Sequence, residues 1–434
     1  MKRNVSNKLS SWKDSLSRKP LIIRGARQVG KTYSIKKFGN EHFSNVVVLD
    51  FERNRSLNAV FEKDLDPKKL VTELEIHAGK KIVPGETLLF FDEIQACERA
   101  LLSLRYFYEE MPELHIIAAG SLLEFAMSNI SFPVGRITFE WMRPMTFKEF
   151  LISSGKEIIA EKIPSIFSRE PISSTLHDLL IEQLRIYFIV GGMPEAVKRF
   201  IETGSATDVK KVHDDIIYSY IQSLTKYDLK ANIESIEQVL SVIPSKVGQQ
   251  IKYRHLDPDR RIELTKTSLG ILEKALLVNL VRSTHISGLP LGAGVNSKVF
   301  KPIFLDIGLM QSLCGADPKE SITATDLNNI YKGAVAEQFV GQELLAAGGS
   351  ENHKLYYWSR SKKSSTAEVD FVFVRNSKIY PVEVKSGAKG RMKSIHILLE
   401  EHPEIEKGFA LSSTFSKHQL VENIVFAPIY SEMK

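Results

Sequence analysis

The feature that most constrains this chain is the segment Gly25-Ala26-Arg27-Gln28-Val29-Gly30-Lys31-Thr32. A glycine, a short spacer and Gly-Lys-Thr form a loop whose backbone N–H groups can surround a phosphate chain at the start of a helix. The apolar run at 20–23 predicts the buried strand that such a loop follows, and residues 33–38 predict the helix after it. The sequence therefore predicts a site for a nucleoside triphosphate.

The residue types in this segment suit a bound triphosphate. Gly25 and Gly30 allow the backbone to turn tightly and to approach the phosphates. Lys31 would place its ammonium beside the outer phosphates and act in catalysis, and the Thr32 hydroxyl would bind Mg²⁺. All of residues 25–32 are predicted to bind the nucleotide.

A second apolar run, Thr87 to Phe91, ends in the acidic pair Asp92-Glu93. An all-apolar strand is typical of a parallel sheet covered on both faces, and such sheets bind ligands at the carboxyl ends of their strands. We expect Asp92 to hold Mg²⁺ through water and Glu93 to polarise the attacking water. The alternative is that both carboxylates only begin a helix.

Two further runs, 45–50 and 114–121, are expected in the same sheet. Ser121 ends the second run, where its hydroxyl would sense the terminal phosphate or orient the water. Because Ser121 and Glu124 also form a capping box, a simple helix cap is the alternative. Arg136 would stabilise transition-state charge as an arginine finger, in its own subunit or a neighbour's, unless it is an ordinary surface arginine.

These segments resemble the AAA+ class of ATPases. Three further segments look like a prokaryotic subfamily in which the ATPase module precedes a domain of unknown function: Gly135-Arg136, the run at 143–150 and Gly191-Gly192-Met193-Pro194-Glu195-Ala196. The resemblance implies a P-loop NTPase fold, an α/β architecture with a parallel sheet flanked by helices, and binding and hydrolysis of ATP with Mg²⁺.

Helix and strand breakers after residue 150 suggest how the rest of the chain is divided. We expect an ATPase domain at 1–150, a helical connecting or lid region at 151–207, a winged-helix-like domain at 208–320 and a nuclease-like domain at 321–434. In the third part, residues 265–273 predict a second helix of a helix-turn-helix, and 276–281 with 299–305 predict a wing. Candidate DNA phosphate contacts there are Arg260, Arg261, Lys266, Arg282 and Lys298, although such folds also serve as docking or structural elements.

The C-terminal part carries a second set of chemical residues. Glu337 lies on a predicted helix at 330–345, Asp370 on a predicted strand, and Glu383 and Lys385 on one face of the next strand. This order resembles the PD-(D/E)xK nuclease fold, with Val369 in place of the proline. The resemblance implies that Asp370, Glu383 and Glu337 hold Mg²⁺ or Mn²⁺, and that Glu383 and Lys385 act in hydrolysis.

The alternative for this second set is a strand-borne salt bridge to Lys385 in a fold that binds without cleaving. Basic residues that would neutralise a nucleic-acid backbone are Arg360, Lys362, Lys363, Lys389, Arg391 and Lys393. The neighbouring aromatic run at 356–358 predicts strand core, with base stacking as its alternative.

Composition narrows the function classes. With 43% hydrophobic and 25% charged residues in 434, we expect two or three folded domains, and the net charge of +6 is compatible with DNA contact without demonstrating it. Only Cys97 and Cys314 occur, and no apolar stretch near the N-terminus could span a bilayer, so we expect a cytoplasmic protein without disulfides, a zinc site or membrane insertion.

Three functions fit these predictions. The first is an ATPase whose nucleotide state controls a C-terminal nuclease-like module that contacts DNA. The second is a nucleotide-regulated, metal-dependent nuclease. The third is a non-enzymatic scaffold that uses ATP for assembly.

Overall fold

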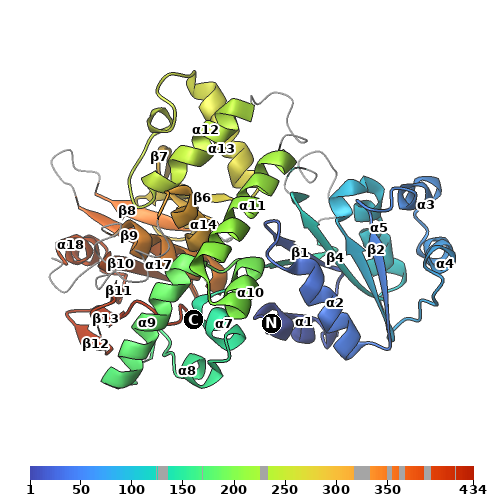
Figure 1. Cartoon of the computed structure of the whole chain (residues 1–434), viewed down its shortest axis with the longest axis horizontal. Helices are drawn as coiled ribbons and strands as arrows, with labels where there is room; N and C mark the ends of the chain where they lie inside the picture. The colour runs from blue at the N-terminus through green and yellow to red at the C-terminus, as the bar shows by residue number, and fades with distance from the viewer. Residues whose placement is uncertain are drawn as a thin grey trace. The chain divides into compact units, whose positions relative to one another are not determined.

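A computed structural model of the whole chain is shown in Figure 1, and it describes residues 1–123, 125, 135–168, 170–224, 233–316, 333–348, 354–360, 367–385, 392–415 and 417–434. The chain forms two compact units. Unit 1 comprises Met1–Arg143 with Lys274–Leu276, and unit 2 comprises Pro144–Glu273 with Leu277–Lys434. The first boundary lies close to the expected end of the ATPase part, and the finer division into four domains stays a prediction.

Unit 1 is built on a five-stranded parallel sheet in the order β2-β3-β4-β1-β5. The strands are β1 (Leu21–Gly25), β2 (Asn45–Asp50), β3 (Thr87–Asp92), β4 (His115–Ser121) and β5 (Thr138–Trp141). The predicted strands and the P-loop NTPase fold are confirmed. Because β4 lies between β1 and β3, the phosphate loop, Ser121 and the acidic pair all meet at one edge of the sheet.

Helices flank this sheet. They are α1 (Val5–Lys13), α2 (Lys31–His42), α3 (Leu57–Lys63), α4 (Pro67–Ala78), the short 3₁₀ helix η1 (Ile94–Ala96) and α5 (Glu98–Glu110). Every residue of β3 and β4 is buried, as their apolar patterns predicted. Phe91 of β3 packs edge to face against Phe51, Phe61 and Phe107 with ring centroids 5.6–6.3 Å apart, which holds the end of β3 in place.

Unit 2 contains an eight-stranded mixed sheet in the order β12-β13-β11-β10-β9-β8-β6-β7. Its strands are β6 (Val278–Thr284), β7 (Val295–Phe304), β8 (Tyr356–Ser359), β9 (Glu368–Arg375), β10 (Lys378–Lys385), β11 (Gly408–Ser412), β12 (Gln419–Val421) and β13 (Ile424–Pro428). Among the helices that accompany it, α17 (Ala334–Ala347) packs against β7 and β10, and α18 (Lys393–Glu401) packs against β9 and β10 (Figure 1).

The remaining helices of the second part of the chain precede or interrupt this sheet. They are α7 (Phe147–Ser153), α8 (Glu157–Glu161), α9 (Ser174–Val190), α10 (Pro194–Thr203), α11 (Ala206–Leu224), α12 (Ile233–Val242), α13 (Ile262–Lys274) and α14 (Ile307–Leu313), with the 3₁₀ helices η2 (Ile243–Lys246), η3 (Tyr253–His255) and η4 (Leu291–Gly294). Within the described residues, no helix combines the length and the apolar composition needed to cross a membrane.

The expected wing is not a sheet of its own. Strands β6 and β7 pair in antiparallel fashion, as predicted, but β6 also pairs in parallel with β8, where Arg282 lies opposite Tyr356. The hairpin is therefore one end of the eight-stranded sheet. The winged-helix prediction is not confirmed, because the free edge of β6 is paired by a strand that lies far along the chain.

Two segments of the subfamily resemblance meet inside unit 2. The amide of Met145 donates to the carbonyl of Gly192 across 2.7 Å, and a Cβ on Gly192 would lie 2.1 Å from the carbonyl oxygen of Met145. The buried carboxylate of Asp306 accepts from the amide of Gly192 at 2.6 Å and from the first turn of α14. These contacts connect two segments of unit 2 that are distant in the sequence. The close approach of the backbone explains why a glycine stands at position 192.

Candidate functional site

The phosphate loop is formed where the sequence predicted it. β1 ends at Gly25 and α2 begins at Lys31. Gln28 and Gly30 have φ angles of 61° and 94°, which turn the backbone into the first turn of α2. A Cβ on Gly25 would lie 2.2 Å from the carbonyl oxygen of Met142, so no larger residue fits at the end of β1.

Lys31 is directed into the loop. Its ammonium donates to the carbonyl oxygens of Gly25 at 2.8 Å and Ala26 at 2.7 Å. Burial lowers the pKa of Lys31 to about 8, while the nearby carboxylates of Glu93 and Asp92 oppose that shift. The arrangement therefore keeps a cation at the mouth of the loop, between backbone dipoles and the acidic pair.

Thr32 and Asp92 lie side by side although they belong to different segments. The Thr32 hydroxyl donates to Oδ1 of Asp92 across 3.1 Å. Burial raises the pKa of Asp92, and the hydrogen bond from Thr32 opposes this shift. Two neighbouring oxygen ligands next to a phosphate loop fit Mg²⁺, which prefers one or two protein oxygens together with phosphates and water.

Glu93 is held by residues from two elements. Its Oε2 accepts from the backbone amide of Ser121 at 3.2 Å, from the Ser121 hydroxyl at 3.0 Å and from Nε2 of Gln95 at 2.5 Å. Its φ of 49° is rare for a residue with a side chain and is typical of functional sites. The acidic pair therefore does more than begin a helix. The capping-box alternative for Ser121 depends on Glu124, which lies outside the described residues.

Arg27 extends this network. Its Nε donates to the Ser121 hydroxyl at 3.0 Å, and its guanidinium lies 3.7 Å from a carboxylate oxygen of Glu52. The sequence predicted Arg27 only as a loop residue and did not identify Gln95 or Glu52. Whether these residues lie near Glu93 and Ser121 depends on the order of the strands in the sheet. The one signal in the sequence is that Gln95 follows Glu93 by two residues.

A residue near the N-terminus also contacts the loop. The buried guanidinium of Arg3 donates to the carbonyl of Val29 at 2.8 Å and to the carbonyl of Arg143 at 2.7 Å. Nothing in the sequence around Arg3 signals this role. It ties the phosphate loop to the segment that follows β5.

Arg136 lies away from this site. Its side chain pairs with Glu109 at 3.0 Å, and both are partly exposed. Glu109 is in the last turn of α5, which leads to the start of β4, and Arg136 precedes the start of β5. In a parallel sheet both positions are at the amino edge, opposite the phosphate loop. The geometry thus favours a surface arginine over a finger in its own subunit, and a role in a neighbour's site stays a prediction.

The second predicted set of residues is also brought together, within unit 2. Lys385 pairs with Glu383 along β10 at 2.6 Å, which is the salt bridge weighed as the alternative. Oδ2 of Asp370 accepts from the amide of Val384 at 2.8 Å. Burial raises the pKa of Glu383 to about 7, and the charge of nearby Asp370 contributes to the rise.

A lysine that the sequence did not identify lies among these carboxylates. The ammonium of Lys301, from β7, lies 2.7 Å from Glu337, 2.8 Å from Glu368 and 3.0 Å from Asp370. Lys301 is the one charged residue in the predicted apolar strand 299–305, and the next charged residue, Asp306, directly follows that strand. A charged residue in a buried strand requires a partner, and this signal could have been used.

The carboxylates do not fit the metal that the nuclease resemblance implies. Among the described residues, no group of three or more His, Cys, Asp or Glu side chains is arranged to hold a metal ion. Two of the three predicted ligands, Glu337 and Asp370, are already paired with the Lys301 ammonium, and the third, Glu383, is paired with Lys385.

Several basic residues expected to contact nucleic acid are in ion pairs within the chain. Arg360 pairs with Glu401, Arg282 pairs with Glu273, and Arg260 pairs with Glu234 and Asp257. Lys362, Lys363, Lys389 and Arg391 lie outside the described residues. The aromatic residues of β8 are buried, which confirms them as strand core.

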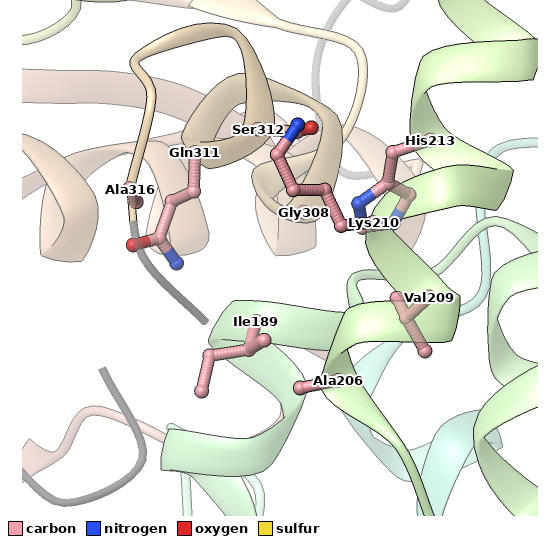
Figure 2. A pocket seen from close by; sticks show the side chains of 9 residues that line it. All are labelled: Ile189, Ala206, Val209, Lys210, His213, Gly308, Gln311, Ser312 and Ala316. Carbon is pink, nitrogen blue, oxygen red and sulfur yellow. The ribbon is translucent and has the colours of Figure 1, made fainter. Parts of the chain in front are cut away.

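Unit 2 also has a small hollow, partly open to solvent, between α9, α11 and α14 (Figure 2). It is lined by Ile189, Ala206, Val209, Lys210, His213, Gly308, Gln311, Ser312 and Ala316. The His213 imidazole contacts the carbonyl of Val190 at 3.0 Å, and burial lowers its pKa to about 4, so the ring is neutral. The Lys210 ammonium, the charged side chain in this lining, is ion-paired with Asp214.

Three protein families match parts of the chain. Residues 17–151 match an AAA domain, residues 181–320 match a domain of unknown function (DUF8612), and residues 332–431 match another (DUF4143). The first match spans the phosphate loop, the acidic pair and Ser121. Unit 1 therefore combines the P-loop NTPase fold with a match to an AAA domain.

A relative over nearly the whole length is the uncharacterized protein MJ1544 of Methanocaldococcus jannaschii, 22% identical over 421 residues, which are 93% of this chain and 86% of the relative. The RuvB Holliday junction branch migration motor of Thermotoga maritima is 16% identical over 64% of this chain and 89% of its own, with a TM-score of 0.30. Orc1 of Aeropyrum pernix in complex with DNA is 11% identical over 72% of this chain and 90% of its own, with a TM-score of 0.27. These TM-scores are too low to bear on the fold or function of this chain.

Proposed function

We propose that unit 1 binds ATP with Mg²⁺ and hydrolyses it, and that the nucleotide state controls the C-terminal module. The observation that carries the proposal is the contact of 3.1 Å between Thr32 and Asp92, beside a phosphate loop and next to the restrained carboxylate of Glu93. The match of residues 17–151 to an AAA domain supports it.

Each residue has a defined task in this proposal. The loop amides and Lys31 bind the phosphates, while Thr32 and Asp92 hold Mg²⁺, which when bound neutralises phosphate charge. Glu93 orients the attacking water and accepts its proton. Ser121 and Gln95 keep the Glu93 carboxylate in one position, and Arg27 orients the Ser121 hydroxyl.

The test compares ATP turnover and ATP binding in three variants. Lys31→Ala should lose both, because it removes the cation of the loop. Glu93→Gln should bind ATP in calorimetry yet turn it over about 10²–10⁴ times more slowly, the usual worth of a general base. Lys37→Ala, on the exposed face of the same helix, is the matched control and should behave as wild type.

The outcomes separate the alternatives. Turnover that survives Lys31→Ala would overturn the proposal. Tight ATP binding by the wild type without turnover would favour the assembly scaffold instead. Adding DNA to the same assay tests the predicted partner. A rise in ATP turnover that depends on DNA and that Glu93→Gln abolishes would support coupling between ATP hydrolysis and a module that contacts DNA. The nuclease alternative is disfavoured, because the predicted metal ligands are paired with lysines.

A further inference from the structure

The carboxylate cluster of unit 2 is assembled around one ammonium group. Lys301 is 2% exposed, and its Nζ lies 2.7–3.0 Å from one oxygen each of Glu337, Glu368 and Asp370. These three side chains come from α17 and β9, and Lys301 comes from β7. The ammonium donates a hydrogen bond to Oδ1 of Asp370 and is ion-paired with the other two carboxylates.

The charge of Lys301 is stable in this position. Burial alone would lower its pKa, but Asp370, Glu337 and Glu368 raise it well above its usual value. A buried charge is tolerated only when it is paired and hydrogen-bonded, and this one meets both conditions. The ammonium is therefore a permanent cation at the centre of the cluster.

A divalent ion at the same carboxylates would meet two obstacles. Mg²⁺ requires near-octahedral oxygen ligands at about 2.0–2.1 Å, so it would need the oxygens that the ammonium already uses. It would also lie close to a buried positive charge, which repels it. The other oxygen of Asp370 is bonded to the amide of Val384, so that carboxylate has little freedom to turn away.

We propose that Lys301 takes the place of the divalent metal in this nuclease-like cluster, so that the C-terminal sheet of the protein is held and charge-balanced by its own lysine and functions without Mg²⁺ or Mn²⁺. The lysine lies in the region 181–320, outside the family match that contains the carboxylates. The cluster is thus completed by a residue that precedes the first of its carboxylates, Glu337, by more than 30 positions in the sequence. This inference is independent of the ATPase proposal.

The test measures Mn²⁺ binding by calorimetry on the full chain without nucleotide. All proteins carry Asp92→Asn, so that the site of unit 1 is not counted. With Lys301 present, no binding should be detected at the cluster. Lys301→Gln should gain one Mn²⁺ site, because three carboxylates lose their cation and Oε2 of Glu383, which has no hydrogen-bond partner among the described residues, adds an oxygen nearby. Adding Asp370→Asn to Lys301→Gln should remove that site.

Two results would overturn the inference. One is Mn²⁺ binding, or Mn²⁺-dependent cleavage of DNA or RNA, that occurs with Lys301 in place and is lost in Asp370→Asn. The other is a folded Lys301→Gln protein that gains no Mn²⁺ site. If Lys301→Gln does not fold alone, it is refolded with Mn²⁺: recovery of the fold only with the metal supports the replacement, and failure under both conditions contradicts it.

Discussion

The hydroxyl of Ser121 lies 3.0 Å from Oε2 of Glu93, and it also accepts a hydrogen bond from Nε of Arg27 at the same distance. Ser121 ends β4 and Glu93 follows β3, so the contact joins the ends of two neighbouring strands. A serine hydroxyl has one donor and can accept as well, which suits this double contact. The loop and the predicted base are therefore linked through one side chain.

Ser121→Ala should slow ATP turnover and leave ATP affinity nearly unchanged. In the proposed arrangement the hydroxyl positions Glu93, whereas the loop amides and Lys31 bind the phosphates. Loss of one such hydrogen bond corresponds to about tenfold in kcat, or ~1.4 kcal/mol. Steady-state kinetics and ATP titration give the two values. Ser103→Ala is the control, because its hydroxyl donates to the carbonyl of Ala100 within its own helix, α5. An unchanged kcat in Ser121→Ala would refute the positioning role.

Arg3→Ala should loosen the phosphate loop. Two backbone carbonyls, of Val29 and Arg143, would lose a charged donor, which costs about 2–4 kcal/mol of unfolding free energy for unit 1. We also expect a higher Kd for ATP, because the loop backbone is less restrained. Scanning calorimetry and ATP titration measure the two effects. Lys2→Ala, at the exposed neighbouring position, should change neither.

Two glycine-to-alanine substitutions should change the free energy of unfolding in opposite directions. Gly192→Ala should destabilise unit 2 by more than ~2 kcal/mol, because its Cβ would lie 2.1 Å from a backbone oxygen that cannot move freely. Gly270→Ala should stabilise the protein by up to about 1 kcal/mol, because Gly270 is inside α13 with open space around it. Chemical denaturation of both variants checks this pair. Equal effects would show that the close approach at Gly192 is unimportant.

Asp306 should make stability depend on pH. Burial raises its pKa from 3.8 to about 6, and the backbone hydrogen bonds that it accepts oppose the rise. A carboxyl with a raised folded-state pKa contributes stability that is complete below its unfolded pKa and is lost as the pH rises through about 6. Two pKa units correspond to roughly 3 kcal/mol, taken as an upper bound.

Asp306→Asn removes this titration. Its unfolding free energy should therefore fall less than that of the wild type between about pH 4 and about pH 8, whatever its absolute stability. Denaturation at both pH values provides the comparison. Asp208→Asn, which changes a partly exposed ion pair with Lys211, should retain the wild-type pH dependence. A wild-type-like dependence in Asp306→Asn would contradict the assignment.

The phosphate loop, the acidic pair and the strands of unit 1 could be predicted from the sequence. Each depends on residues that are neighbours in the chain: glycine spacing sets the turn, and a run of apolar residues ending in Asp92 requires a covered strand with its end at the ligand edge. The grouping of Glu337, Asp370, Glu383 and Lys385 was also predictable, because strand alternation and element order place them together.

Packing between distant segments decided the rest. Arg3 donates to the carbonyl of Val29. Strand β6 pairs with β8, so the predicted wing is part of a larger sheet. Lys301 lies among carboxylates that come from another region of the chain. No local pattern specifies such contacts, since they depend on which unpaired strand edges and buried charges find partners once the chain has folded. The nucleotide site was therefore visible in short-range patterns, whereas the cation in the second cluster was set by the requirement that a buried charge be neutralised in three dimensions.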